Sequence, residues 1–359
     1  MFSPPHGLDA LRRIAETLLV AAAGGVALGL LGVPAGWLSG AMLAVSLWAL
    51  IKRPLFIPTP LAQIVFVILG ISLGAAITPA AIGRMASWPV SLAVLAIAMT
   101  TVTAAVMFYL RAVHGWDLLS ALFAASPGAL SQTLALAMDT NADQKAIATV
   151  QSVRLLILTV ALPIGLASFA ATGGPPPATS GGAWNDSPGE LALLVTASSL
   201  AAVAARRLRI PGALIVGPML TSGLLHGSGW VDVTVPSVVA NTSFVVLGAA
   251  IGTRFAGIDI GELKRLLATG LGALAVATLV TLAFALGVAG FLSLPIGDVI
   301  LAYAPGGFEA MTILAFALNL DPAFVGVHHF WRFFFVSTLV PVVTRILVRR
   351  RDRAGDKDA

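Results

Sequence analysis

Two arginines stand in strongly apolar stretches of this chain, and their side chains suit the recognition of anions. Arg154 and Arg332 are 178 positions apart (332 minus 154). Each is expected roughly 12–16 Å inside a hydrophobic helix, where an arginine costs about 2.5–3.5 kcal/mol by insertion scales. A guanidinium binds a carboxylate through two parallel hydrogen bonds. The pair therefore predicts an anion site. The alternative is a structural role, in which both arginines bind backbone carbonyls freed at nearby helix breaks.

Glu309 adds a carboxylate close to the second arginine in sequence. It follows Pro305 by four residues, whereas the equivalent position of the first copy holds Ser131. We interpret Glu309 as a proton-coupling group or an ion ligand, and a salt bridge to one of the arginines is the alternative. Because serine cannot replace a carboxylate, the two copies need not act alike.

Three further side chains accompany the arginines. His329 and Arg332 are three residues apart, as are Gln151 and Arg154, so each pair shares one helix face. A histidine here could titrate during transport, and a histidine satisfied by hydrogen bonds inside the helix bundle is the alternative. Tyr303 could contact a solute, although a buried tyrosine hydroxyl needs a partner in any case.

Two proline–glycine motifs would position these residues. Pro127-Gly128 lies in SPGALSQT and Pro305-Gly306-Gly307 lies in APGGFEAM, and a shift of 178 aligns them without a gap. Such motifs interrupt helices, and non-helical backbone at membrane depth is tolerated only inside protein or beside a watery cavity. Each half should therefore contain one broken or re-entrant segment lining a central site. Asp143 and Asp321, which also align, are predicted N-caps of the helices that follow, with solute gating as the alternative.

The composition indicates a membrane protein. Of the 359 residues, 58% are hydrophobic and 10% are charged, against roughly 25% charged in soluble domains. The mean hydropathy is +0.96. The net charge of +5 does not indicate nucleic-acid binding, because the basic residues form short clusters between apolar runs, as the positive-inside rule describes.

Several classes of chemistry lack their sequence motifs. The chain contains no cysteine, so disulfides, zinc–thiolate sites and iron–sulfur clusters are excluded. The Walker lysine motif, HExxH, GxSxG and CxxC are also absent from the sequence. The five histidines are too scattered to favour a copper or iron centre. We expect no enzymatic activity, no cofactor and no metal.

The apolar runs divide the chain into two similar halves. We expect a cytoplasmic N-terminal segment (1–13), a first membrane repeat (14–170), an exposed linker (171–189), a second membrane repeat (190–348) and a charged, disordered cytoplasmic tail (349–359). Gly70 and Gly74 in the first half align with Gly248 and Gly252 in the second. Small residues four apart predict that another helix approaches closely.

Two topologies fit these runs. If each broken segment crossed the membrane, each half would have six spans and the Arg206–Arg209 cluster would lie outside. If each broken segment enters and returns, each half has five spans, and of the Lys and Arg clusters only Arg84 lies on the wrong side. The Lys/Arg bias favours five. We therefore predict an all-α polytopic membrane protein with two inverted-topology repeats of about five transmembrane helices, a plan common in secondary transporters.

The duplicated block, its APGGFEAM and SPGALSQT breaks and the deep arginine in the helix that follows resemble the AbrB-type integral membrane family, over about residues 14–348. That family is distinct from the soluble transition-state regulator of similar name. Its members carry provisional labels as regulators of gene expression or ammonia monooxygenases. The resemblance implies the duplicated membrane fold and supplies no site residues. The residues themselves support neither label, so any regulatory effect would be indirect.

These observations favour a secondary transporter or channel for a small anionic solute, with a midplane site between inverted repeats. An AbrB-like membrane regulator acting indirectly on gene expression is the alternative, and a membrane oxygenase is the least favoured. The expected partners are the lipid bilayer and a small-molecule solute, not nucleic acid, and the oligomeric state stays open, a homo-oligomer included. We expect a multi-pass protein of the cell inner membrane with both termini cytoplasmic.

Overall fold

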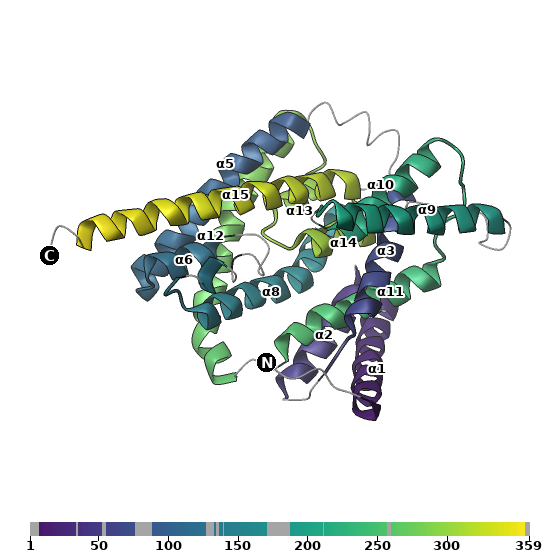
Figure 1. The fold of residues 1–359 in the computed structure, drawn as a ribbon, viewed down its shortest axis with the longest axis horizontal. Coiled ribbons are helices and arrows are strands. Elements are labelled where there is room, and N and C mark those ends of the chain that lie inside the picture. Colours follow the sequence, from purple (N-terminus) through teal and green to yellow (C-terminus); the bar gives the residue numbers. More distant parts are fainter. Residues whose placement is uncertain are drawn as a thin grey trace. The chain divides into compact units, whose positions relative to one another are not determined.

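The structure is a computed structural model, and every element assigned in it is helical. It describes residues 7–33, 35–51, 55–75, 88–126, 133, 136–138, 140–170, 187–210, 212–256 and 260–355. Along these ranges, Figure 1 shows the elements α1 (Leu8–Leu30), α2 (Gly36–Leu50), α3 (Thr59–Ala75), α5 (Trp88–His114), α6 (Leu118–Ala125), α8 (Gln144–Ala170), α9 (Pro188–Arg207), α10 (Ala213–Gly227), α11 (Ser237–Gly252), the 3-10 turn η2 (Thr253–Phe255), α12 (Ile260–Leu292), α13 (Ile296–Tyr303), α14 (Phe308–Ala317) and α15 (Pro322–Gly355).

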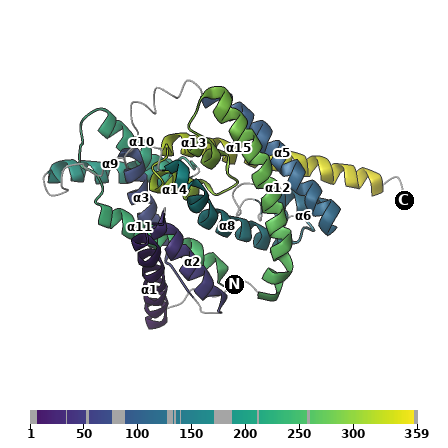
Figure 2. The ribbon, with the colours of Figure 1, turned by 180° about the vertical axis from the view of Figure 1, so that it is seen from behind.

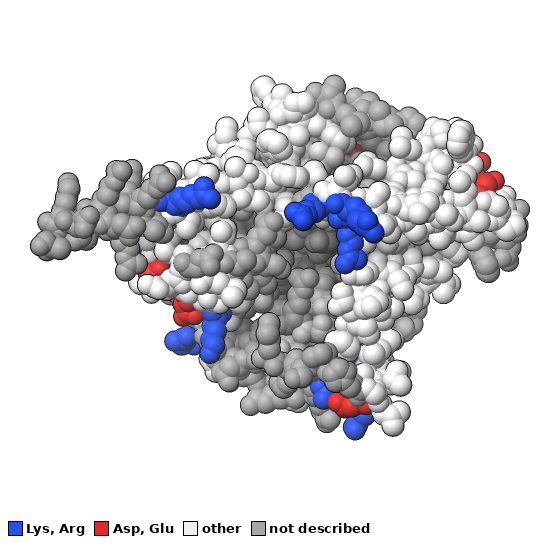
Figure 3. Space-filling view, viewed as in Figure 1, with Lys and Arg blue, Asp and Glu red and all other residues white. Residues whose placement is uncertain are grey.

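Many of these helices suit a membrane. Within the described ranges, five are long and apolar enough to cross a bilayer, and they lie in α1, α5, α9, α12 and α15. Four shorter apolar helices, α2, α3, α10 and α11, accompany them. Leucine, valine and phenylalanine side chains are exposed along α1, α5, α9 and α12, as lipid contact requires. In the face drawn in Figure 3, the described surface is largely uncharged, with Lys and Arg in a few separate groups. The chain is a multi-pass membrane protein.

The helices form two compact units, and each unit takes segments from both halves of the chain. One unit comprises Met1–Ala86, Leu156–Ile260 and Glu309–Val325. The other comprises Ser87–Leu155, Gly261–Phe308 and Gly326–Ala359. We call them the glycine unit and the arginine unit, after the residues that characterise them below. The predicted halves are therefore continuous in sequence but are not separate compact bodies.

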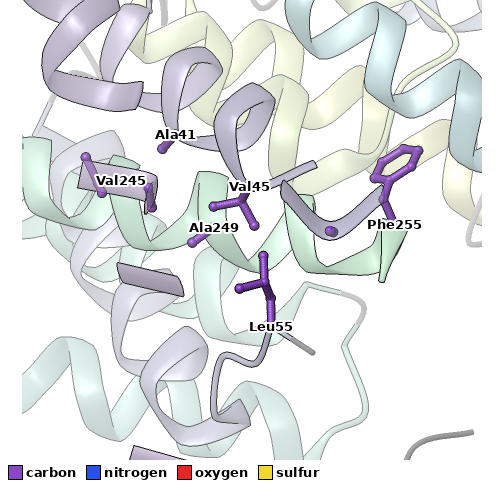
Figure 4. Close-up of a cluster of buried hydrophobic side chains, with 8 residues drawn as sticks. Ala41, Val45, Leu55, Val245, Ala249 and Phe255 are labelled. Atoms are coloured by element: carbon purple, nitrogen blue, oxygen red, sulfur yellow. The ribbon is translucent and has the colours of Figure 1, made fainter. Parts of the chain in front are cut away.

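The glycine unit is built from α1, α2 and α3 together with α9, α10 and α11. Helix α2 packs on α1 and α11, and α10 packs on α9 and α3. Figures 1 and 2 both show α2 beside α11. A buried apolar cluster joins this pair to the segment that follows α2, and Figure 4 labels its members Ala41, Val45, Leu55, Val245, Ala249 and Phe255. Burial of these side chains fixes one helix of each half against the other.

The glycines of α3 allow α10 to approach at backbone distance, as predicted. A Cβ atom at Gly70 would lie 2.8 Å from the carbonyl oxygen of Ile215, and one at Gly74 would lie 2.3 Å from that of Met219. The contact moves forward on both helices together, so α3 and α10 run in the same direction. The hydroxyl of Ser222 secures the pair by donating to the carbonyl of Ile71 at 2.7 Å.

The equivalent glycines of α11 do the same against α2. A Cβ atom at Gly248 would lie 2.5 Å from the carbonyl oxygen of Leu38, and one at Gly252 would lie 2.8 Å from the Cβ of Val45. These contacts also advance together, so α11 and α2 run in the same direction. The prediction of close helix approach is confirmed at all four glycines.

Helix boundaries repeat along the chain with the spacing found in the sequence. Adding 178 to the bounds of α6 gives those of α13, and adding it to the first residue of α8 gives the first residue of α15. The last residues of α5 and α12 are related in the same way. The segments around the two breaks thus begin and end at matching positions.

The second broken segment has the predicted interruption. Helix α13 ends at Tyr303, and α14 begins at Phe308, with Ala304–Gly307 between them. Their 8 and 10 residues span about 12 and 15 Å at helical rise, each well short of a bilayer core of about 30 Å. In the first copy, α6 ends at Ala125. Pro127 and Gly128 lie outside the described residues.

Helices extend into both expected terminal segments. Helix α1 begins at Leu8, inside the segment 1–13, because the Arg13–Asp9 ion pair at 2.7 Å supports its first turns. Helix α15 extends to Gly355, so most of the tail expected to be disordered is helical, in keeping with the helix propensity of arginine and alanine. Helix α9 begins at Pro188, two residues before the expected start of the second repeat, and residues 171–186 lie outside the described ranges.

Candidate functional site

The candidate site lies in the arginine unit, where α8 and α15 carry the two arginines. Both helices begin just after an aspartate, and both aspartates cap them as predicted. The Asp143 carboxylate accepts from the amide of Ala146 at 3.0 Å. The Asp321 carboxylate accepts from the amides of Ala323 and Phe324, each at 3.0 Å. These caps fix the first turn of each helix, and the arginine follows three turns later.

Arg332 binds the broken segment directly. Its Nη1 donates to the carbonyl of Ala304, and its Nη2 donates to the carbonyl of Gly306. The side chain is only 2% exposed. Helix α13 ends just before these residues, and the Ala304 carbonyl also accepts from the amide of Gly306 at 2.8 Å. The structural interpretation of Arg332 is therefore confirmed, and an additional role toward a solute stays a prediction.

Gln151 and His329 make equivalent hydrogen bonds, one in each copy. The amide nitrogen of Gln151 donates to the carbonyl of Phe123 at 2.8 Å. The Nε2 of His329 lies 3.0 Å from the carbonyl oxygen of Leu301, which only accepts, so Nε2 carries the hydrogen. Phe123 and Leu301 are again 178 positions apart (301 minus 123). Each side chain thus holds the end of the short helix before its break, α6 or α13.

Arg154 is buried with part of its hydrogen-bonding capacity unused. Its side chain is 7% exposed, and among the described residues its Nε has no partner. Arg154 on α8 and Arg332 on α15 both belong to the arginine unit. Among the side chains that the structure describes, no carboxylate pairs with either arginine. This combination attracts an anion.

Tyr303 ends α13 and is held by α5 instead of facing open space. Its hydroxyl donates to the carbonyl of Ser91 at 2.7 Å and lies 3.3 Å from the Ser91 hydroxyl. The Nε2 of His328 lies 2.8 Å from that same hydroxyl. All three side chains are fully buried. Tyr303 therefore has the partner that a buried phenol needs, and its contact with a solute stays a prediction.

The break itself leaves room beside its backbone. Among the described residues, a Cβ atom at Gly307 would meet only the Cδ2 of Leu155, at 3.9 Å. Pro305 and Gly306 are buried, and Gly307 is partly exposed. The backbone of Glu309 belongs to the first turn of α14, but its side chain lies outside what the structure describes. At Gly307 the described neighbours therefore leave the backbone less crowded than at the glycines of α3.

The sequence analysis missed Ser91, which joins Tyr303 to His328. These residues are 212 and 237 positions from Ser91, and a lone serine in an apolar run carries no signal of such a role. It also missed that Gln151 and His329 hold the preceding short helices. Phe123 and Leu301 are equivalent positions, but the sequence does not show that their carbonyls accept these hydrogen bonds.

Comparisons with other proteins agree with this architecture. Residues 37–348 match the family model described as "Transition state regulatory protein AbrB". The chain is 24% identical over 373 residues to "Uncharacterized protein YhjN" of Bacillus subtilis (strain 168), covering 95% of this chain and 94% of that protein. It is 23% identical over 326 residues to "Putative regulator AbrB" of Escherichia coli (strain K12), covering 88% and 90%. No solved structure gives a significant match. Since the family model covers most of its length, this multi-pass membrane protein belongs to the AbrB family.

Proposed function

We propose that this protein is a secondary transporter or channel for a small anionic solute, and not an enzyme. The observation that carries the proposal is the pair of buried arginines, Arg154 and Arg332, which come from matching helices of the arginine unit. Each costs about 2.5–3.5 kcal/mol to bury in a bilayer by insertion scales. Arg332 recovers part of that cost at the break, whereas Arg154 keeps an unused donor.

An inverted repeat is the second element of the proposal, and helix direction supports it. Helix α10 is the counterpart of α2 by position in the two halves. It runs in the same direction as α3, to judge by the advancing contacts of Gly70 and Gly74. If α2 and α3 are consecutive spans, they run in opposite directions, and α10 then opposes its own counterpart. The pairing of α11 with α2 supports the same conclusion.

The proposed site places the two breaks and the two arginines near the midplane of the membrane. Non-helical backbone there must be buried in protein or line a cavity, and interrupted helices of inverted repeats commonly bind solutes. Arg154 and Arg332 would attract the anion, Gln151 and His329 would hold the adjacent short helices, and Glu309 would couple or gate. Pro127-Gly128, Pro305-Gly306-Gly307 and Tyr303 would shape the site. We place both termini on the cytoplasmic side of the inner membrane.

Flux through proteoliposomes tests the proposal. The purified chain is reconstituted, and uptake of a panel of labelled organic and inorganic anions is measured. Arg154→Gln should weaken uptake of the transported anion about tenfold to 150-fold, since hydrogen bonds to a charged group contribute about 1.5–3 kcal/mol. Lys145→Gln is the matched control, because Lys145 is an exposed cation on the same helix. Both variants must elute and melt like the wild type before flux is compared.

Two outcomes would contradict the proposal. Uptake by Arg154→Gln equal to that of Lys145→Gln would remove the arginine from the site. A wild-type chain that moves no anion of any class would remove transport itself.

A membrane regulator is the second candidate, favoured by the family description and by the printed name of the Escherichia coli relative. Regulation without transport predicts altered gene expression on deletion together with no flux in proteoliposomes. Regulation through a transported metabolite predicts that Arg154→Gln abolishes both effects together.

A further inference from the structure

Two buried hydrogen-bond acceptors are left without partners, and they occupy matching positions in the two copies. Gln151 uses its amide nitrogen on Phe123, and among the described residues its Oε1 has no partner. His329 uses Nε2–H on Leu301, and its Nδ1 has no partner either. With Nε2 protonated, Nδ1 of a neutral imidazole is an acceptor. Both side chains are completely buried.

Leaving these atoms unpaired is expensive enough to require an explanation. A buried acceptor without a donor loses its hydration with no compensation, and buried polar groups are nearly always satisfied. Their role at the ends of α6 and α13 needs only the nitrogen donors that both side chains already use. That role does not use Gln151 Oε1 or His329 Nδ1, so each copy holds one buried acceptor that the contact with the short helix does not explain.

The positions of these acceptors connect them with the arginines. Gln151 lies one helical turn before Arg154, and His329 lies one turn before Arg332, so each acceptor shares a helix face with a guanidinium. The Nε of Arg154 is an unused donor in the same unit. The unit thus offers positive charge with a free donor, and neutral acceptors beside it.

We propose that the solute is a small hydroxycarboxylate, whose carboxylate binds the arginines and whose hydroxyl donates to Gln151 Oε1 or His329 Nδ1. This inference rests on the proposed transport function and narrows its substrate class. A donor on the solute is required because both leftover atoms are acceptors. The donor is a hydroxyl and not an ammonium group, because the two buried guanidinium groups of this unit would repel the positive charge of an ammonium.

Binding to matched solutes tests this inference. Affinities are measured on the purified wild-type chain in detergent for acetate, glycolate and glycine, and for propionate, lactate and alanine. Within each set the first solute lacks a donor, the second adds a hydroxyl and the third adds an ammonium. We expect the hydroxy acid to bind about threefold to tenfold more tightly than the acid without a hydroxyl, as one net hydrogen bond provides.

Variants locate the acceptors. At least one of Gln151→Leu and His329→Leu should reduce the ratio of lactate to propionate affinity. His329→Gln is the matched control, because it gives the second copy the residue of the first, with both donor and acceptor. It should retain the ratio. A merely structural role would weaken both solutes equally, so the ratio is informative even where a variant is less stable.

The outcomes separate the two proposals. Binding of acetate and propionate as tight as that of glycolate and lactate overturns the inference and leaves anion transport standing. Binding of glycine and alanine that is tighter than that of glycolate and lactate would identify the donor as an ammonium, and would also overturn the inference. A wild-type chain that binds none of the six, and moves no other anion in liposomes, overturns both proposals.

Discussion

Gly74→Ala should destabilise the glycine unit, because it places one methyl group where two helix backbones already touch. The new Cβ would lie 2.3 Å from the carbonyl oxygen of Met219, 2.5 Å from the Cβ of Ser222 and 2.7 Å from the amide nitrogen of Gly223. Two of these three atoms belong to the backbone of α10. They cannot move aside without shifting the helix, so α3 and α10 must separate.

The magnitude follows from two opposing contributions. Overpacking costs about 1–3 kcal/mol, whereas replacing a helical glycine by alanine gains about 0.5–1 kcal/mol. Gly287→Ala isolates the gain, because Gly287 is a helical glycine of α12 with no atom within 4 Å of an added Cβ. The two variants should therefore differ by about 1–3 kcal/mol in free energy of unfolding, with Gly287→Ala above the wild type and Gly74→Ala below it.

Unfolding by SDS in mixed micelles provides the assay, followed by the fluorescence of the chain's 7 tryptophans. Equal stability of Gly74→Ala and Gly287→Ala would refute the close approach of α3 and α10. The parallel direction of these helices, which supports the inverted repeat, would then lose its basis.

Two further predictions concern the break and the topology. Arg332→Ala should lower the free energy of unfolding in the same assay by about 1–3 kcal/mol, because it removes the arginine donor from the Gly306 carbonyl, whereas the Ala304 carbonyl keeps the Gly306 amide as a donor. Arg345→Ala, which removes an exposed arginine from the same helix, should have little effect. Equal stability of these two variants would contradict the structural role of Arg332. Ile51→Cys and Gly229→Cys, at exposed and equivalent positions of a chain that has no cysteine of its own, should react with a membrane-impermeant maleimide from opposite sides of the membrane. Labelling of both from one side would contradict the inverted repeat.

The sequence predicted features that depend on neighbouring residues. The interruption after Tyr303 follows from a Pro-Gly-Gly motif, and the caps at Asp143 and Asp321 follow from aspartates just before apolar runs. The close approach at Gly74 follows from the spacing of small residues. Each of these signals resides within one helical turn or one short motif, which is why sequence alone contains it.

Features that depend on tertiary placement could not be predicted in this way. Nothing in the sequence indicates that the Tyr303 hydroxyl meets Ser91, or that segments of both halves combine in each compact unit. The two arginines occupy equivalent positions in the sequence but differ in the structure. Arg332 donates to two backbone carbonyls, whereas the Nε of Arg154 has no partner among the described residues. Helices α1 and α15 extend into the charged terminal segments, because arginine and alanine favour the helix and charge alone does not end it.

The exchange of partners in the glycine unit bears on how such a chain could have arisen. Helix α2 packs on α11, and α3 packs on α10, so each of these helices covers its glycine-rich contact with a helix of the other half. One half alone would leave these contact surfaces uncovered. If the two halves derive from one duplicated gene, a single-copy ancestor would have needed a second molecule of itself to cover these surfaces. Fusion of the two copies would then have made their association intramolecular, and therefore independent of protein concentration. Later drift could make the copies unequal, as histidine opposite glutamine already illustrates.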